Sequence, residues 1–187
     1  VVKNFEVNGE KVNLSILETP GHTPDHQCCL FIRGGRNEFI YLGEAGGTIY
    51  HTSKLVSMPT SMPVYFDYEH FMRSLHHMQE LETPQLAGYT HFGVVKGQEN
   101  VRYMLEEQEE FLKEFRSRVI QYYKEDPSTK HVFKRLVPFF AKRSDIGGEN
   151  DVALENIVLG VIYGMLLDLG YRTLDEEEIK EIKFYPH

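Results

Sequence analysis

The sequence predicts an α/β protein of the α+β type, with strands concentrated in its first half and helices in its second. Short apolar runs alternate with turn signals up to residue 97, and from Val101 onward the apolar residues recur at helical spacing. With 187 residues, 41% of them hydrophobic, the chain can bury a substantial core. We therefore expect an α/β half-domain over residues 1–97 and a helical extension over residues 98–187.

Short apolar runs predict the strands of the first part. Residues 12–17 alternate apolar and polar, and the runs 28–33 and 39–42 are separated by Gly34-Gly35, which predicts a hairpin. Residues 68–81 are typical of a helix and residues 85–89 of a short buried strand, which together predict a strand–helix–strand unit. The stretch from Gly46 to Pro63 sustains no period and predicts a long surface loop.

Helices account for the rest of the chain. Apolar residues at 101–122 follow a 3.6-residue period through a charged background, which predicts one long amphipathic helix ending before Pro127. Two further helices are predicted at 130–141 and 152–169, the second with a cap at Asn150-Asp151 and an end at Gly170. Residues 175–183 form a mostly charged tail.

Charge and composition exclude several classes of function. The balance of 20 basic against 28 acidic residues gives a net charge of −8, which argues against nucleic-acid binding. No apolar run approaches the roughly 18 residues of a membrane span, and no leader is evident. Cys28 and Cys29 are adjacent and cannot bridge the fold, which favours a reducing, cytoplasmic setting. The first residue, Val1, indicates a fragment or a trimmed product.

Polar residues that can bind metal follow the predicted strands. His22 lies in the turn segment Thr19-Pro20-Gly21-His22-Thr23-Pro24-Asp25-His26, Glu44 follows the run 39–43, and His91 follows the run 85–89. Imidazole and carboxylate groups are typical ligands of divalent metals. Each residue alone is better explained as a polar core, turn or cap residue, but three such placements at successive strand ends favour a metal site.

Other residues are candidates for supporting roles. His26 fits a place beside the ligands, since ligating histidines need partners that fix their tautomer, and Asp25 is either such a partner or a turn residue. In the loop, His51 is a candidate for contact with a substrate. Met58 and Met62 either line an apolar pocket or pack the loop down. His70, His76 and His77 are expected to be solvated.

The segments 19–26, Tyr41-Leu42-Gly43-Glu44 and Thr90-His91-Phe92-Gly93, in this order, resemble the latter half of the metallo-β-lactamase superfamily, the group that includes glyoxalase II, lactonases and ribonuclease Z. The resemblance covers residues 10–97. It implies the second half of an αββα sandwich, followed by the helical C-terminal extension. It also implies that His22 binds a first metal, that Glu44 bridges two metals and that His91 binds the second, whereas His26 matches a family histidine that is normally not a ligand.

The sequence departs from the family pattern in two ways. The bridging acid is normally aspartate, and Glu44 is one methylene longer. The His-x-His-x-Asp-His segment, which supplies most of the family's ligands, does not occur in this chain. The resemblance therefore implies that an amino-terminal half, in the same parent chain or a separate one, completes the site, and that this chain alone is inactive.

The activity implied by the resemblance is that of a metal-dependent hydrolase. One or two divalent ions, zinc foremost and iron or manganese as alternatives, would activate water against a small ester, thioester or lactone. Two alternatives remain open: a non-catalytic scaffold or partner half without a complete metal centre, and a non-haem iron oxidoreductase. The helical extension resembles those that shape substrate access or form a homo-oligomer contact in some family members.

Overall fold

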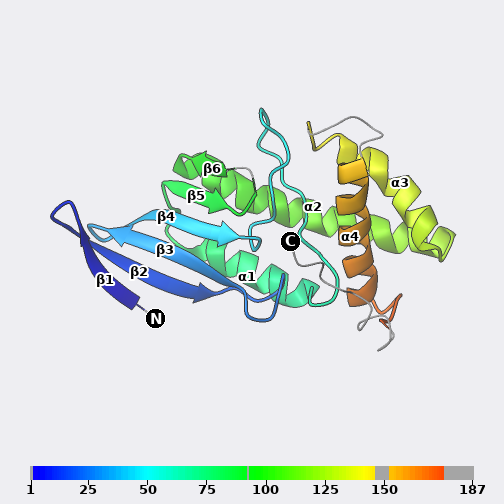
Figure 1. Cartoon of the computed structure of the whole chain (residues 1–187), viewed down its shortest axis with the longest axis horizontal. Helices are drawn as coiled ribbons and strands as arrows, with labels where there is room; N and C mark the ends of the chain where they lie inside the picture. Colours follow the sequence, from blue (N-terminus) through cyan, green and yellow to red (C-terminus); the bar gives the residue numbers. More distant parts are fainter. Residues whose placement is uncertain (1, 92, 146–151, 175–187) are drawn as a thin grey trace.

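A six-stranded sheet forms one layer of the molecule (Figure 1). The computed structural model describes residues 2–91, 93–145 and 152–174. The strands lie in chain order: β1 (Val2–Val7), β2 (Glu10–Glu18), β3 (Gln27–Arg33), β4 (Arg36–Gly43), β5 (Leu86–Tyr89) and β6 (Gly93–Lys96). Neighbouring strands are antiparallel except β4 and β5, which run parallel. The carboxyl ends of β4 and β5 therefore meet at the same end of the sheet.

The helices are α1 (Tyr68–Glu80), α2 (Gln98–Glu125), α3 (Thr129–Ala141) and α4 (Val152–Asp168). In the view of Figure 1, α1 and α2 lie behind the sheet and form a second layer, whereas α3 and α4 lie beyond the end of the sheet and pack on each other and on α2. In α1, Phe71, Leu75 and Met78 recur at helical spacing and are buried, while the side chain of the N-cap Asp67 accepts from the backbone N–H of His70. A continuous hydrophobic core links the sheet to all four helices.

The structure confirms the mixed α/β class and the predicted hairpin at Gly34-Gly35, which joins β3 to β4. The predicted strands and helices coincide with β2, β3, β4, β5 and all four helices within a few residues at their ends. Gly170, at φ +68°, ends α4 as expected, and the N–H of Tyr171 donates to the carbonyl oxygen of Leu166 at 2.9 Å. The predicted cap Asn150-Asp151 and the charged tail lie outside the described residues.

Two strands, β1 and β6, were not expected from the sequence. β1 is an edge strand whose residues 3–7 are exposed, so burial imposes no apolar pattern on it. β6 has four residues, of which only Val95 is buried. Both strands are defined by pairing with a neighbour, which a local pattern does not reveal.

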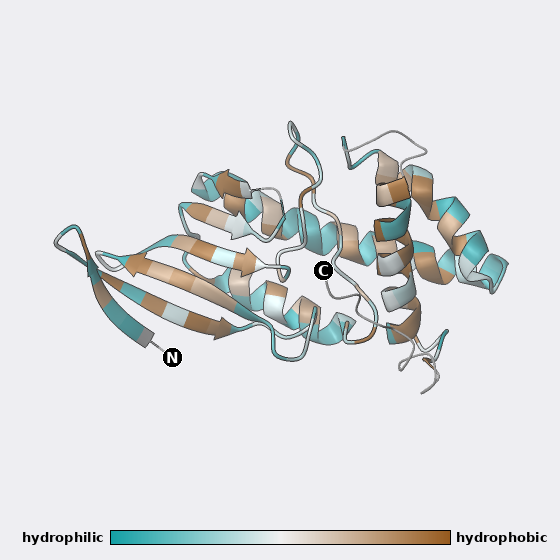
Figure 2. Ribbon diagram, in the orientation of Figure 1, coloured by the Kyte–Doolittle hydropathy of each residue, from teal (hydrophilic) through white to brown (hydrophobic). Residues whose placement is uncertain are grey.

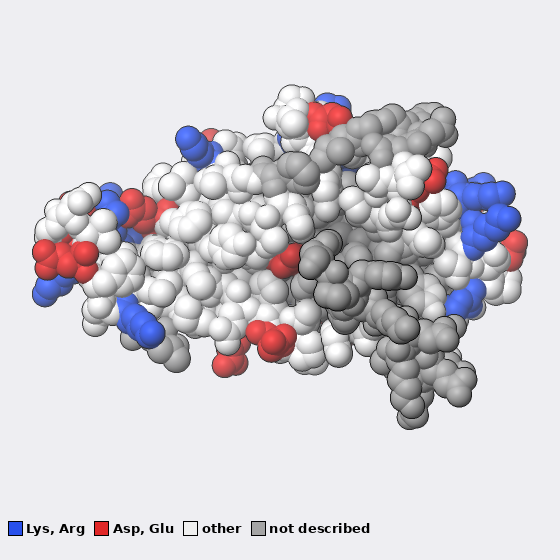
Figure 3. Space-filling model, in the orientation of Figure 1, with Lys and Arg blue, Asp and Glu red and all other residues white. Residues whose placement is uncertain are grey.

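The face of the sheet away from the helices carries apolar side chains that no described element covers. Phe5, Tyr41 and Val94 are exposed on it, and the rings of Phe31 and Phe39 lie side by side with centroids 5.5 Å apart. Most of β3 and the second half of β4 are hydrophobic, whereas β1 is mostly hydrophilic (Figure 2). Charged side chains lie mainly around the edge of this side of the molecule, and the surface over the strands is mostly uncharged (Figure 3).

The segment between β4 and α1 contains no helix or named strand, as predicted; the expectation that it lies on the surface is confirmed for the exposed residues 52–54 but is wrong for residues 57–61. Ser57, Met58, Thr60 and Ser61 are all buried. The segment is covered because it packs against α4, where the hydroxyl of Ser61 donates to the carbonyl oxygen of Val161 at 2.8 Å. Glycine on α4 makes this contact possible, since a Cβ at Gly164 would lie 2.0 Å from the Ser61 carbonyl oxygen.

In the part of the chain that the structure describes, no helix combines the length and the apolar character needed to cross a membrane.

Candidate metal centre

Three chain segments bring His22, Glu44 and His91 to one end of the sheet. Glu44 follows Gly43, the last residue of β4, and His91 lies two residues beyond the end of the parallel strand β5. His22 lies in the turn that connects β2 to β3. All three residues line the same cavity, as their placement after successive strands predicts.

The turn that carries His22 is fixed by contacts with α1. Gly21 adopts φ +141°, and a Cβ there would lie 2.3 Å from the backbone Cα of Phe71. The hydroxyl of Ser74 donates to the carbonyl oxygen of Pro20 at 2.7 Å, and the N–H of Asp67 donates to that of Gly21 at 2.8 Å. The Pro-Gly pair thus allows the backbone to approach the helix closely and holds His22 in place.

The orientation of the His22 imidazole is set by Thr60. Nδ1 of His22 lies 2.7 Å from the carbonyl oxygen of Thr60, and because a carbonyl only accepts, Nδ1 carries the proton. Nε2 of the neutral ring then keeps a lone pair. A histidine whose other nitrogen donates to a backbone carbonyl has the arrangement typical of a metal ligand.

His26 is engaged at both ring nitrogens. Nε2 accepts from the backbone N–H of Glu44 at 3.2 Å, and Nδ1 lies 2.8 Å from the hydroxyl of the buried Thr19. Burial, together with the nearby His22, lowers the pKa of the His26 imidazole, which favours the neutral ring. Its Nε2 lone pair is used on the backbone, so His26 supports Glu44 and offers no free nitrogen to an ion.

Gly43 provides the space that His26 occupies. It adopts φ +56°, and a Cβ at this position would lie 2.7 Å from Nε2 of His26. The glycine before Glu44 therefore serves both the turn after β4 and the approach of the imidazole.

Glu44 lies between two imidazoles. Its Oε1 is 3.8 Å from Nε2 of His91, and its Oε2 is 3.9 Å from Nε2 of His26. Two donors bound tetrahedrally to one zinc ion lie about 3.3 Å apart, so Glu44 and His91 are near that spacing. Within the described residues, however, no three His, Cys, Asp or Glu side chains are close enough together to hold a metal. The donor types fit a divalent ion, and the set is incomplete.

The cavity beside these residues has a volume of about 160 Å³. Its polar lining residues are His22, Glu44, Thr48, Thr60 and His91, its apolar lining residues are Pro59 and Met62 of the loop and Ile157 and Val161 of α4, and Tyr50 also lines it. The Tyr50 ring stacks on His91 with centroids 6.3 Å apart, and burial raises the pKa of its phenol. The phenol is therefore protonated at neutral pH and can donate a hydrogen bond.

Comparison with solved structures points to one fold. No family model matches the sequence, and no curated protein matches it. Among solved structures, an archaeal metallo-β-lactamase superfamily protein from Sulfolobus tokodaii is 24% identical with a TM-score of 0.50, and the alignment covers 88% of this chain and 49% of that one. A stereoselective inverting sec-alkylsulfatase from Pseudomonas sp. is 12% identical with a TM-score of 0.52, covering 99% of this chain and 28% of the other. A β-lactamase domain protein from Burkholderia ambifaria is 14% identical with a TM-score of 0.50, covering 90% and 45%.

The chain has a metallo-β-lactamase fold. It spans about half the length, or less, of the structures it matches. These likenesses extend through the helices as well as the sheet, since they cover at least 88% of the chain.

Of the remaining predicted site residues in this metallo-β-lactamase fold, some line the cavity and others do not. Met62 lines the cavity, whereas Met58 is fully buried in the core and pairs through its backbone with Thr48. His51 does not line the cavity; its Nδ1 lies 3.3 Å from the carboxylate of Asp145. Asp25 is exposed and accepts a hydrogen bond from the hydroxyl of Thr23 at 2.8 Å, so it acts within the turn.

Several residues at the site were not predicted from the sequence. Thr60 contacts His22 through its carbonyl and Glu44 through its hydroxyl, which donates to the Glu44 carbonyl oxygen at 2.8 Å. Ile157 and Val161 reach the cavity from a helix more than a hundred residues away along the chain. Gly160 and Gly164 could have indicated that α4 lies against another segment, because two glycines four residues apart on a helix allow another backbone to approach closely.

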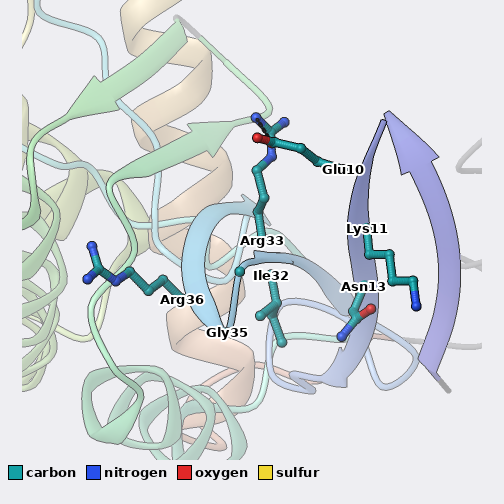
Figure 4. Close-up of a pocket in the computed structure, with 8 residues that line it drawn as sticks. Glu10, Lys11, Asn13, Ile32, Arg33, Gly35 and Arg36 are labelled. Carbon is teal, nitrogen blue, oxygen red and sulfur yellow. Dashed lines mark ion pairs between the residues drawn. The ribbon is translucent and has the colours of Figure 1, made fainter. Parts of the chain in front are cut away.

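A second concavity lies at the opposite, hairpin end of the sheet (Figure 4). It is larger, about 710 Å³, and is lined by Glu10, Lys11, Asn13 and Arg33 among others. Arg33 pairs with Glu10 at 3.4 Å and with Glu38 at 2.9 Å, so its charge is compensated within the protein. None of the described residues that line this open surface is a histidine, and it lies away from the strand ends that carry His22, Glu44 and His91.

Cys28 offers no alternative nucleophile. It is fully buried, and burial raises the pKa of its thiol to about 12, so the reactive thiolate is not formed at neutral pH. Its sulfur instead donates to the carbonyl oxygen of Leu42 at 3.3 Å. Both cysteines are free, as expected from their adjacency.

Proposed function

We propose that the chain forms part of a metal-dependent hydrolase acting on a small ester, thioester or lactone, with His22, Glu44 and His91 as its ligands. The observation that carries this proposal is the presence of two imidazoles and a carboxylate on one cavity, delivered by three successive strand ends. Their donor types suit zinc, with iron and manganese as alternatives.

The chain's own residues prepare the site for an ion. Thr60 keeps the proton of His22 on Nδ1, which leaves Nε2 available. His26 holds the backbone of Glu44 at 3.2 Å and thereby fixes the position from which its carboxylate reaches the cavity. A divalent ion bound there would supply Lewis acidity, lowering the pKa of water to about 7 and polarising a carbonyl oxygen. Tyr50 lines the same cavity, and because burial raises the pKa of its phenol, this group is protonated at neutral pH.

The remaining ligands would come from an amino-terminal half of the same parent chain or of a separate chain. The uncovered apolar sheet face supports this, because exposed Phe5, Tyr41 and Val94 would be buried by a second layer. The lengths of the matched structures also support it, since this chain covers only 28% to 49% of them.

A second candidate is a scaffold without catalytic activity. It is favoured by one observation, that no three of the described His, Cys, Asp or Glu side chains are grouped closely enough to bind a metal. In that case the fold would provide the apolar sheet face as an interaction surface, and the polar residues at the strand ends would serve only the turns.

Elemental analysis and an esterase assay of this chain in complex with an amino-terminal half separate these candidates. Bound zinc, together with hydrolysis of an uncharged aryl ester that is lost in a Glu44→Gln variant, supports the hydrolase. Bound iron with visible absorbance and no hydrolysis would contradict the hydrolase and support an oxidoreductase. A folded complex without metal would contradict the hydrolase and support the scaffold.

A further inference from the structure

We propose that the cavity binds the uncharged, apolar part of the substrate, and that it accepts an alkyl or acyl group of about six carbon atoms. This inference rests on the proposed function for the role of that group in a reaction. The binding itself depends only on the cavity.

The walls of the cavity divide into a reactive side and an apolar side. His22, Glu44 and His91 lie on the first, while Met62, Ile157 and Val161 lie on the second. Among the residues that the structure describes, no lysine or arginine lines it. A carboxylate bound here would face Glu44 without a compensating cation, so the cavity disfavours anionic groups and suits apolar ones.

The volume sets the size of the group. The cavity measures about 160 Å³. An engineered cavity of about 150 Å³ lined by aliphatic and aromatic side chains stays dry and binds benzene, a molecule of six carbon atoms. Chains longer than this would have to leave the cavity or displace Met62, which is 42% exposed at its rim.

The apolar wall is built into the fold. A Cβ at Gly160 would lie 3.0 Å from Cε of Met62, and a Cβ at Gly164 would lie 2.0 Å from the carbonyl oxygen of Ser61. The hydroxyl of Ser61 also donates to the carbonyl oxygen of Val161 at 2.8 Å. These contacts fix the loop against α4, so the wall exists before a ligand binds, which reduces the ordering cost of binding.

The test uses the chain after a chelator has removed any metal. Butanamide, pentanamide, hexanamide and octanamide are each titrated into it, and binding is followed through the NMR signals of the protein's backbone amides. We expect affinity to rise about fourfold per methylene up to hexanamide and to level off at octanamide. Ile157→Trp, which fills the cavity from its edge, should weaken hexanamide binding at least tenfold. Leu159→Trp, on the exposed side of the same helix, should leave it unchanged.

Equal binding of hexanamide by the wild type and a folded Ile157→Trp variant would overturn the proposal, as would equal or tighter binding of hexanoate. If Ile157→Trp does not fold, the Met62→Ala variant is used instead. Its cavity is larger, so affinity should continue to rise from hexanamide to octanamide. An unchanged dependence of affinity on chain length would count against the proposal. Because the amide titration uses the metal-free chain, a negative result in it would not contradict the proposed hydrolase. A loss of metal binding in other experiments would likewise not contradict the proposal that the cavity binds an apolar group.

Discussion

Nδ1 of His22 donates to the carbonyl oxygen of Thr60 across 2.7 Å, and through this bond the helical part of the chain acts on the candidate metal centre. Thr60 precedes Ser61, whose hydroxyl binds the backbone of α4. The orientation of a residue in the β2–β3 turn therefore depends on a helix near the end of the chain.

This relationship predicts unequal effects of alanine at two glycines of α4. Gly164→Ala places a Cβ 2.0 Å from a backbone oxygen, so it should lower the free energy of unfolding by about 2 kcal/mol through overpacking. Displacement of the loop should also shift the NMR signals of the His22 ring. Gly160→Ala is the matched control, since its Cβ meets only the flexible end of Met62 at 3.0 Å. Equal stabilities of the two variants would contradict the contact.

A second pair of glycines tests the support that His26 gives to Glu44. Gly43 and Gly34 both adopt φ +56°, but only Gly43 has His26 within reach of a Cβ. Gly34→Ala should lower the free energy of unfolding by about 1 kcal/mol through backbone strain alone. Gly43→Ala should cost more and should also break the bond from the Glu44 N–H to Nε2 of His26. The bond is read from the 15N shifts of the His26 ring, and unchanged shifts in Gly43→Ala would count against it.

The contact between α1 and α2 should make stability depend on pH. Burial acts to raise the pKa of Glu109, but hydrogen bonds from Lys113, Gln79 and His76 outweigh burial and hold it at about 2. A carboxylate with a pKa below its unfolded value of 4.5 stabilises the fold above that pH and loses this contribution as the pH falls from 4.5 toward 2.

Glu109→Gln should accordingly lower the free energy of unfolding by about 1 kcal/mol at pH 7, and the difference from wild type should shrink below pH 4.5. Urea denaturation at a series of pH values measures both. Glu110→Gln, at an exposed position of the same helix, should show no such dependence. A deficit of the same size at pH 7 and pH 3 in Glu109→Gln would refute the assignment.

The sequence predicted the parts of the site that follow from strand order. His22, Glu44 and His91 each come after an apolar run, and a strand–helix–strand unit places two successive strand ends side by side. The same reasoning did not find Thr60, because it acts on His22 through a carbonyl that every residue possesses. It did not find the cavity wall from α4 either, since Ile157 and Val161 have the apolar character of any core helix.

The fold was predictable where burial imposes a pattern and less so where pairing alone defines an element. β3 and β4 contain continuous apolar runs and α1 has a helical period, because these elements contribute side chains to the core. β1 has no such period, since its residues 3–7 are exposed. The loop containing Met58 was expected on the surface because its polar residues resemble those of exposed loops, but two of its buried hydroxyls are satisfied by α2 and α4: Ser57 donates to Glu107 and Ser61 to Val161.

The most direct test of the central claim is a zinc titration of the chain, monitored through the NMR signals of its histidine rings. The Nε2 signals of His22 and His91 should shift, and His22→Ala and His91→Ala should each weaken zinc binding at least tenfold. The exposed His70 and His77 serve as controls and should be dispensable. Zinc binding of unchanged affinity in the His22→Ala, His91→Ala double variant would contradict the account.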